Sequence, residues 1–397
     1  MRKTIYMDNA ATTAVRPEVL AKMLPYFTER YGNPSSIHGT GREASKAVER
    51  ARKQVADAIG AQPGEIFFTS GGSESDTWAI RCASQKGKHI ITSKIEHHAV
   101  LHACAAMEKQ GYEVTYLPVD GDGLIDPEDV KKALRPDTAL VSIMTANNEI
   151  GTLEPIAQVG EIVQAAGVPF HTDAVQAAGA IPLDCSALHV DMLSLSAHKF
   201  HGPKGVGALY VRKGTKLGRL IYGGAQERGL RAGTENVPAI VGMGEALSLA
   251  ANELPSAAKR VLALRERLIN GLLREIPECR LNGHRTLRLP GNVNVSLRHI
   301  EAKALLACLD LVGIACSSGS ACTSGSLDTS HVLLAIGLPD EIARGSLRLS
   351  LGAENTAEEV DAVLRVLPGI VRELRSRNSA ESSPEKQEDA VCAANTQ

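Results

Sequence analysis

Short apolar runs alternate with amphipathic stretches over roughly the first 255 residues. Between several of the runs, apolar positions recur at helical spacing, at residues 99–110, 127–134 and 156–166, and one more amphipathic stretch covers residues 41–61. Seven runs have the length of buried strands: residues 66–69, 89–92, 113–117, 139–144, 169–172, 192–195 and 206–211. This alternation predicts an α/β fold, a large domain over residues 16–255 whose mainly parallel, seven-stranded sheet has helices on both faces.

The pattern changes near residue 255, where a long charged helix over residues 256–275 is predicted. Strands at 292–297 and 346–351 and helices at 302–311, 329–336 and 356–375 follow, which predicts a smaller α+β domain over residues 256–375. Residues 1–15 are expected to pack with this small domain. Residues 376–397 are mostly polar and charged, and we expect a disordered tail there because it has little to bury.

Composition narrows the class of protein. Of the 397 residues, 44% are hydrophobic and 22% are charged, which is typical of a soluble globular chain. The net charge of −2 gives no bulk attraction to nucleic acid or to an anionic membrane. There is neither an apolar run of about 20 residues nor a signal-peptide pattern, so a cytoplasmic location is expected.

The eight cysteines are scattered, at positions 82, 104, 185, 279, 308, 316, 322 and 392. They form no C-x-x-C pair and lack the spacing of a zinc site, so no intrinsic metal is expected. Most of them are expected to be small buried hydrophobic residues, with one or two that need a chemical explanation.

The segment 69–76 reads Thr-Ser-Gly-Gly-Ser-Glu-Ser-Asp, between a predicted strand and a helix predicted at 77–83. Gly71 and Gly72 let the backbone approach a ligand, and a helix N-terminus with the hydroxyl of Ser73 can hold a phosphate. A plain capping box, with Ser73 paired to Asp76, explains the same residues equally well.

Two further residues stand at predicted strand ends. Asp173 follows a buried strand at the edge where open α/β sheets bind ligands, and it needs either a protonated heterocyclic nitrogen or a structural arginine as partner. Lys199 follows the strand at 192–195; a lone lysine is usually a solvated charge, but at a core strand end it can form a Schiff base. A phosphate cradle, a carboxylate and a lysine together are what pyridoxal phosphate requires.

Over residues 4–375 the sequence resembles the cysteine desulfurases, in the class V aminotransferase branch of the fold-type I pyridoxal-phosphate enzymes. The matching motifs are found at residues 7–13, 31–36, 96–100, 147–152, 226–234, 317–323 and 348–352. The resemblance implies that Lys199 binds the cofactor aldehyde and that Asp173 binds the pyridine nitrogen. His97 would stack on the ring and assist proton transfers, although a structural core histidine is the ordinary reading of such a residue.

The same resemblance assigns the rest of the cofactor site. Asn148 and Gln176 would contact the region of the ring hydroxyl. The phosphate would be held by Gly72, Ser73, Ser196 and His198, joined by Thr234 from the other subunit of a homodimer. The family usually has Ala-Thr at positions 72 and 73; here Ser73 keeps the hydroxyl, and glycine at position 72 suggests a looser loop.

Cys322 and Arg348 are the candidates for substrate chemistry. Cys322 lies in the run Ser-Ser-Gly-Ser-Ala-Cys-Thr, which has too little apolar surface to pack, so a reactive thiol is favoured there; Cys316 is expected to end a core strand. Arg348 alternates with Leu347 and Leu349 and so points away from their face, normally to solvent. The resemblance makes Arg348, with Asn148, the site of the substrate carboxylate.

The implied activity converts L-cysteine to L-alanine and leaves sulfur as a persulfide on Cys322, for transfer to a sulfur-acceptor or iron–sulfur scaffold protein in cluster assembly. Cys322 is also considered as a transient iron–sulfur ligand. The alternatives are a selenocysteine lyase, another lyase or aminotransferase with this cofactor, and a non-catalytic cofactor-binding scaffold. The polar tail favours the nitrogen-fixation type over the housekeeping type.

Overall fold

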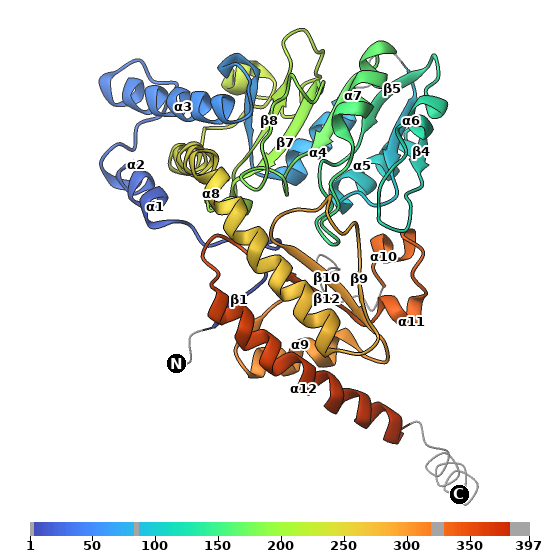
Figure 1. The fold of residues 1–397 in the computed structure, drawn as a ribbon. Coiled ribbons are helices and arrows are strands. Elements are labelled where there is room, and N and C mark those ends of the chain that lie inside the picture. The colour runs from blue at the N-terminus through green and yellow to red at the C-terminus, as the bar shows by residue number, and fades with distance from the viewer. Residues whose placement is uncertain (1–3, 83–86, 319–328, 382–397) are drawn as a thin grey trace, which may run out of the picture.

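The computed structural model describes residues 4–82, 87–318 and 329–381, and its largest sheet has seven strands. Their order across the sheet is β2-β8-β7-β6-β5-β3-β4, and β8 alone runs opposite to the other six strands (Figure 1). The strands are β2 (Ile66–Thr69), β3 (His89–Ser93), β4 (Glu113–Leu117), β5 (Thr138–Ser142), β6 (Phe170–Asp173), β7 (Met192–Ser196) and β8 (Gly207–Val211). The predicted α/β class and the mainly parallel seven-stranded sheet are confirmed.

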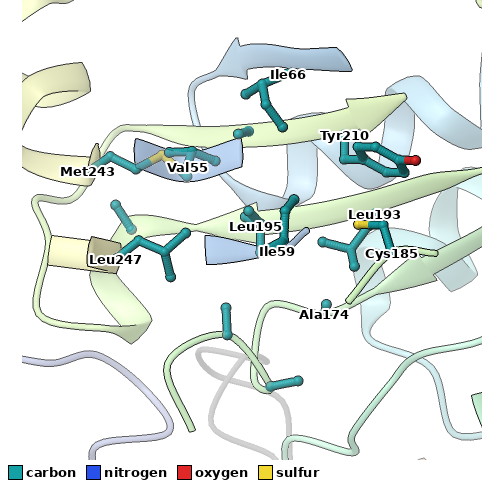
Figure 2. Packing of buried hydrophobic residues seen from close by; sticks show 14 of the residues in the cluster. Val55, Ile59, Ile66, Ala174, Cys185, Leu193, Leu195, Tyr210, Met243 and Leu247 are labelled. Carbon is teal, nitrogen blue, oxygen red and sulfur yellow. The ribbon is translucent and has the colours of Figure 1, made fainter. Parts of the chain in front are cut away.

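Helices cover both faces of this sheet because successive strand residues point to opposite sides. In β7, Leu193 and Leu195 face one apolar cluster and Met192 faces another. The first cluster is covered by α3 (Gly39–Ala58), α6 (Pro127–Ala133) and α7 (Ile156–Ala165), and the second by α4 (Gly72–Cys82) and α5 (His98–Glu108). Figure 2 shows Val55 of α3 and Ile59, the residue that follows this helix, packed beside the strands of the large sheet in the first cluster.

A single 39-residue helix, α8 (Val237–Glu275), runs from the large sheet to a second core. Met243 and Leu247 pack in the first cluster (Figure 2), whereas Leu268 and Leu272 belong to the second core. The prediction of a helix that starts at residue 256 is therefore wrong at its beginning, because apolar positions already recur at helical spacing from Val237. Pro255 lies inside α8, close to where the helix passes from one core to the other.

The second core surrounds a three-stranded antiparallel sheet of order β12-β10-β9. Its elements are β9 (Cys279–Leu281), β10 (Asn292–Leu297), α9 (Ala302–Leu311), β12 (Ser346–Ser350) and α12 (Ala357–Glu381). Two short strands, β1 (Ile5–Tyr6) and β11 (Ile314–Ala315), pair in parallel, and Met7 is buried in this core. The helix α12 continues to Glu381, so the disorder expected from residue 376 is wrong for residues 376–381.

Short elements complete the described chain: α1 (Pro17–Met23), α2 (Pro25–Thr28), α10 (His331–Ala335) and α11 (Asp340–Ala343). Within the described residues, no helix combines the length and the apolar character that crossing a membrane would require.

Candidate active site

A cavity of about 290 Å³ opens at the carboxyl ends of the parallel strands, between the large sheet and β12. Asp173 is the last residue of β6, and Lys199 ends the short 3-10 helix η2 (Ala197–Lys199) that directly follows β7. Because β6 and β7 are parallel neighbours, both side chains reach the same edge of the sheet. The cavity is lined by ten of the twelve site residues predicted from the sequence: Gly72, Ser73, His97, Asn148, Asp173, Gln176, Ser196, His198, Lys199 and Arg348.

The amine of Lys199 is held by the N-terminal segment. Its Nζ donates to the backbone carbonyls of Ala10 at 2.6 Å and Ala11 at 2.8 Å. Gln176 Nε2 also donates to the Ala10 carbonyl, at 3.0 Å. These two carbonyl groups fix the position of the amine, and because they are uncharged they do not hold it in an ion pair.

Asp173 is buried, and burial raises the pKa of its carboxyl to about 6, against the opposing effects of the Val175 N–H and the Lys199 charge. The Val175 N–H donates to Asp173 Oδ1 at 2.8 Å. His97 stands at the N-cap of α5, where its Nδ1 accepts from the Ala99 N–H at 3.1 Å. Burial and the Lys199 charge lower the pKa of His97 to about 4, so the ring is neutral near pH 7. A neutral ring can stack and can accept a proton.

The glycine-rich loop leads into α4, which begins at Gly72 and not at residue 77 as predicted. The capping-box alternative is therefore wrong: Ser73 lies in the first helical turn, and Asp76 lies inside the helix. A Cβ at Gly72 would come within 2.7 Å of Val175 Cγ2. Val175 thus fills the space that an alanine side chain at position 72 would need, and the looser loop stays a prediction.

Arg348 is almost completely buried, at 3% exposure, and faces the cavity rather than solvent. Its NH1 donates to the Asn148 carbonyl at 2.9 Å, and its NH2 pairs with Asp8 Oδ1 at 3.0 Å. Its Nε is buried and has no hydrogen-bond partner among the described residues. The core-facing Leu347 and Leu349 fix the strand, and the anchored guanidinium offers a ready site for a carboxylate.

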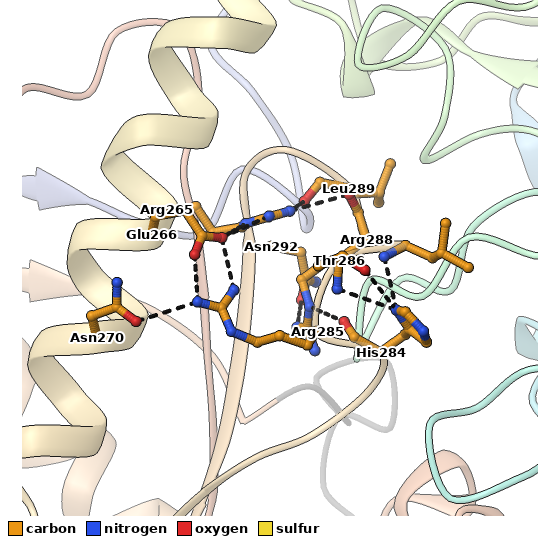
Figure 3. A network of polar contacts seen from close by, with 10 residues as sticks. Arg265, Glu266, Asn270, His284, Arg285, Thr286, Arg288, Leu289 and Asn292 are labelled. Carbon is orange, nitrogen blue, oxygen red and sulfur yellow. Dashed lines mark hydrogen bonds and ion pairs between the residues drawn. The ribbon is translucent and has the colours of Figure 1, made fainter.

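The loop that carries Asn148 is fixed by the start of β10 and by the segment between β9 and β10, whose Leu289 N–H donates to the Gly151 carbonyl at 2.9 Å. Both Asn292 Nδ2 and Asn294 Nδ2 donate to the Glu149 carbonyl at 3.1 Å. Figure 3 shows how that segment is tied to α8: Arg265 donates to the Leu289 carbonyl and pairs with Glu266, which also binds Arg285. The position of Asn148 therefore depends on contacts between residues far apart in the sequence.

Two predicted site residues are not brought into the cavity. Thr234 is exposed and does not line it, so its proposed contact from another subunit stays a prediction. Cys322 lies outside the described residues. The last described residues before it do lie at the site: Ser317 forms a β-bridge with Arg348, and Ser346 Oγ donates to the Ser318 carbonyl at 2.8 Å.

One ionisable residue of the cavity was missed. Asp76 is 1% exposed and lines the cavity beside Asp173, although the sequence showed it only as a partner for Ser73. The signal that could have found it is its position one helical turn after the phosphate loop, on the face that α4 turns to the sheet.

The cavity has donors of the right kinds for pyridoxal phosphate. An amine at Lys199 fits the aldehyde, a buried carboxylate at Asp173 fits a protonated ring nitrogen, and the N-terminus of α4 fits the phosphate. Gly72 supports this fit because its missing side chain leaves the loop close to Val175 and Ser196.

Comparisons with known proteins agree with this geometry. The family model "Aminotransferase class-V" matches residues 5–363. A cysteine desulfurase IscS of Methanosarcina thermophila is 58% identical over 378 residues, which cover 94% of this chain and 93% of that protein. A cysteine desulfurase IscS of Clostridium botulinum is 55% identical, covering 94% and 96%. A solved structure named "NIFS-LIKE PROTEIN" superposes with a TM-score of 0.88 at 43% identity, covering 93% of this chain and 99% of that one.

The fold and the cavity together define a fold-type I enzyme of the class V aminotransferases that uses pyridoxal phosphate. Within that class, the chain belongs to the cysteine desulfurase family. The family, fold class and cofactor expected from the sequence are confirmed.

Proposed function

We propose that this protein is a cysteine desulfurase that converts L-cysteine to L-alanine and holds the released sulfur as a persulfide on Cys322. The observation that carries the proposal is the convergence of a lysine amine, a buried carboxylate and an anchored arginine on one cavity. The likeness to IscS proteins over 94% of the chain supports the same reading.

Each side chain has a task that its surroundings suit. Arg348 and Asn148 bind and orient the substrate carboxylate. The Lys199 amine takes the proton from the substrate Cα and returns a proton to the product. His97, neutral at pH 7, stacks on the ring and accepts protons in turn. Bound pyridoxal phosphate supplies the electron sink that makes these proton transfers favourable, and Asp173, Gln176, Ser73, Ser196 and His198 would hold it.

The Cys322 thiolate would attack the substrate sulfur, so that a sulfur–sulfur bond forms as the carbon–sulfur bond breaks. Cys322 follows Ser318 by four residues, a span of at most about 14 Å for an extended chain. Described residues on both sides of the segment 319–328 lie near the cavity: Ser317 forms a β-bridge with Arg348, and Ser330 Oγ donates at 2.5 Å to Glu149 Oε2, next in the chain to Asn148. A span of four residues from Ser318 is long enough for the proposed reaction in the cavity.

The test is alanine release from L-cysteine in the presence of dithiothreitol, for the wild type, Cys322→Ala and the control Cys316→Ala. Cys316 packs against the small core, and burial raises the pKa of its thiol to about 12, so it stays protonated. The wild type and the control should release alanine and sulfide. Cys322→Ala should bind the cofactor with unchanged absorbance and release no alanine.

Full activity of Cys322→Ala would refute the persulfide step and favour an aminotransferase or a selenocysteine lyase, which have no need of that thiol. A wild type that binds cofactor but never releases alanine would favour the non-catalytic scaffold.

The partners and location remain part of the proposal. We place the protein in the cytoplasm as a homodimer in which Thr234 reaches the phosphate of the other subunit's cofactor, with sulfur passed to an iron–sulfur scaffold protein. Its assignment to the nitrogen-fixation type, and a transient iron–sulfur bond to Cys322, stay predictions. Thr234→Ala should weaken cofactor binding while the dimer, measured by sedimentation, persists.

A further inference from the structure

A second carboxyl group stands next to Asp173. Asp76, in the second turn of α4, is 1% exposed, and its Oδ1 has no hydrogen-bond partner in the described parts of the chain. Carboxylate oxygens of Asp76 and Asp173 and a ring nitrogen of His97 all lie within 4.8 Å of one another. Asp76 and Asp173 therefore place two carboxyl groups at the end of the cavity where Asp173 would meet the cofactor ring.

Two carboxylates this close in a buried site cannot both be ionised at low cost. His171, on β6, does not supply a compensating positive charge. Its Nε2 lies 3.7 Å from Asp76 Oδ1 but is hydrogen-bonded to Ser194 Oγ at 2.9 Å. Burial lowers the pKa of His171 to about 3, so it carries no charge. Glu96, in the loop before α5, is another buried carboxyl group close enough to Asp76 to raise its pKa.

The two acids differ in what stabilises a charge on them. Asp173 accepts the Val175 N–H and faces the positive charge of Lys199. Asp76 has a hydrogen bond from Ser194, and no cation among the described residues affects it, so burial and the Asp173 charge raise its pKa well above the ordinary value. The proton of the pair therefore belongs on Asp76.

We propose that Asp76 is a positioning residue at the ring end of the cofactor site: it keeps the one proton of the Asp76–Asp173 pair, so that Asp173 alone carries the charge. The inference rests on the proposed function for the identity of the ligand, and it adds a residue that the family resemblance did not assign. Asp76 acts through Asp173, which it leaves as the charged member of the pair, while the Val175 N–H orients that carboxylate.

The first test is the melting temperature of cofactor-free protein from about pH 5 to about pH 9, for the wild type and the isosteric Asp76→Asn. A carboxyl whose pKa is raised by folding stabilises the protein while protonated and loses that contribution as the pH rises. The melting temperature of Asp76→Asn should therefore rise relative to that of the wild type as pH increases. A difference between the two that stays constant over this range overturns the proposal.

The second test is the dissociation constant of pyridoxal phosphate, followed by fluorescence and independent of desulfurase activity. Asp76→Asn, which mimics the neutral acid, should bind within about threefold of the wild type, and Asp76→Ala should bind roughly tenfold more weakly. The control Asp191→Asn, a partly buried carboxyl outside the cavity, should not change binding. If Asp76→Asn weakened cofactor binding as much as Asp173→Asn does, Asp76 would be a second charged group and the proposal would be wrong. If Asp76→Ala left the dissociation constant unchanged, Asp76 would have no role in the cofactor site. Loss of alanine release with these affinities intact would instead count against the proposed function.

Discussion

Replacement of Arg348 gives the sharpest test of the proposed substrate site. The guanidinium is anchored on two sides, by the Asn148 carbonyl at 2.9 Å and by Asp8 at 3.0 Å, and its Nε has no hydrogen-bond partner among the described residues. Arg348→Ala removes the group that would bind the carboxylate. Arg348→Lys keeps the positive charge but loses the planar guanidinium, which can bind the Asn148 carbonyl, Asp8 and a substrate carboxylate at the same time.

The size of the effect follows from these contacts. A hydrogen bond between charged groups contributes about 1.5–3 kcal/mol, so the loss of a two-point contact removes about 3 kcal/mol or more of binding to the substrate carboxylate. At about 1.4 kcal/mol for each factor of ten, kcat/KM for L-cysteine should fall by roughly 150-fold in Arg348→Ala. The cost to folding should be below the about 3–5 kcal/mol of a fully buried broken pair, because the Asp8 side chain is 20% exposed and can be solvated.

The assay compares L-cysteine with cysteamine, the same molecule without the carboxylate. Arg348→Ala should lose activity toward L-cysteine and keep its lower activity toward cysteamine, and Arg348→Lys should fall between. Urea unfolding shows whether each variant is folded under assay conditions. Equal losses on the two substrates would refute the reasoning, because Arg348 would then support the site without touching the carboxylate.

Three further substitutions test the fold and the site. Gly72→Ala should weaken cofactor binding through the 2.7 Å contact with Val175 Cγ2, and Gly72→Ala with Val175→Ala should restore it; no rescue would locate the defect elsewhere. Leu349→Ala, in a fully buried position, should lower the free energy of unfolding in urea by about 2–5 kcal/mol. Burial raises the pKa of Glu96 to about 8, so the protein loses the stability that the protonated carboxyl gives it as the pH rises toward 8. Glu96→Gln should therefore have a higher melting temperature than the wild type at alkaline pH. A higher melting temperature at acid pH alone would contradict this.

Some elements were predicted with their exact bounds because their apolar signal is continuous. The bounds of β2, β4, β10 and α9 match the predicted runs, and each is a stretch of apolar residues or an apolar face. The two-residue strands β1 and β11 carry no such signal, since their pairing depends on residues more than 300 positions apart. The start of α4 was misplaced because glycine and serine are turn formers, and the cavity wall holds them in a helix.

The candidate site was predicted as a list of residues, and the structure supplied the reasons they meet. Asp173 and Lys199 could be placed from strand ends alone, because parallel neighbours share an edge. Arg348 could be placed on the polar face of its strand, but whether that face meets solvent or a cavity depends on what covers it. Asp76 was missed because its place on the buried face of α4 shows only once the helix is known to begin at Gly72.

The N-terminal segment explains why so much of the site is invisible to local patterns. Asp8 pairs with Arg348, the carbonyls of Ala10 and Ala11 hold Lys199 Nζ, and Thr13 donates to the His198 carbonyl at 2.9 Å. The first of these contacts spans 340 positions, and those with Lys199 use only backbone carbonyls, which every residue has. Because Asp8 forms a β-bridge with Ser350 of the small sheet, and the carbonyls of Ala10 and Ala11 hold the lysine of the large one, this segment sets the distance between the group that would bind the substrate carboxylate and the amine that would move its proton. A single unpatterned stretch thus positions both halves of the proposed chemistry.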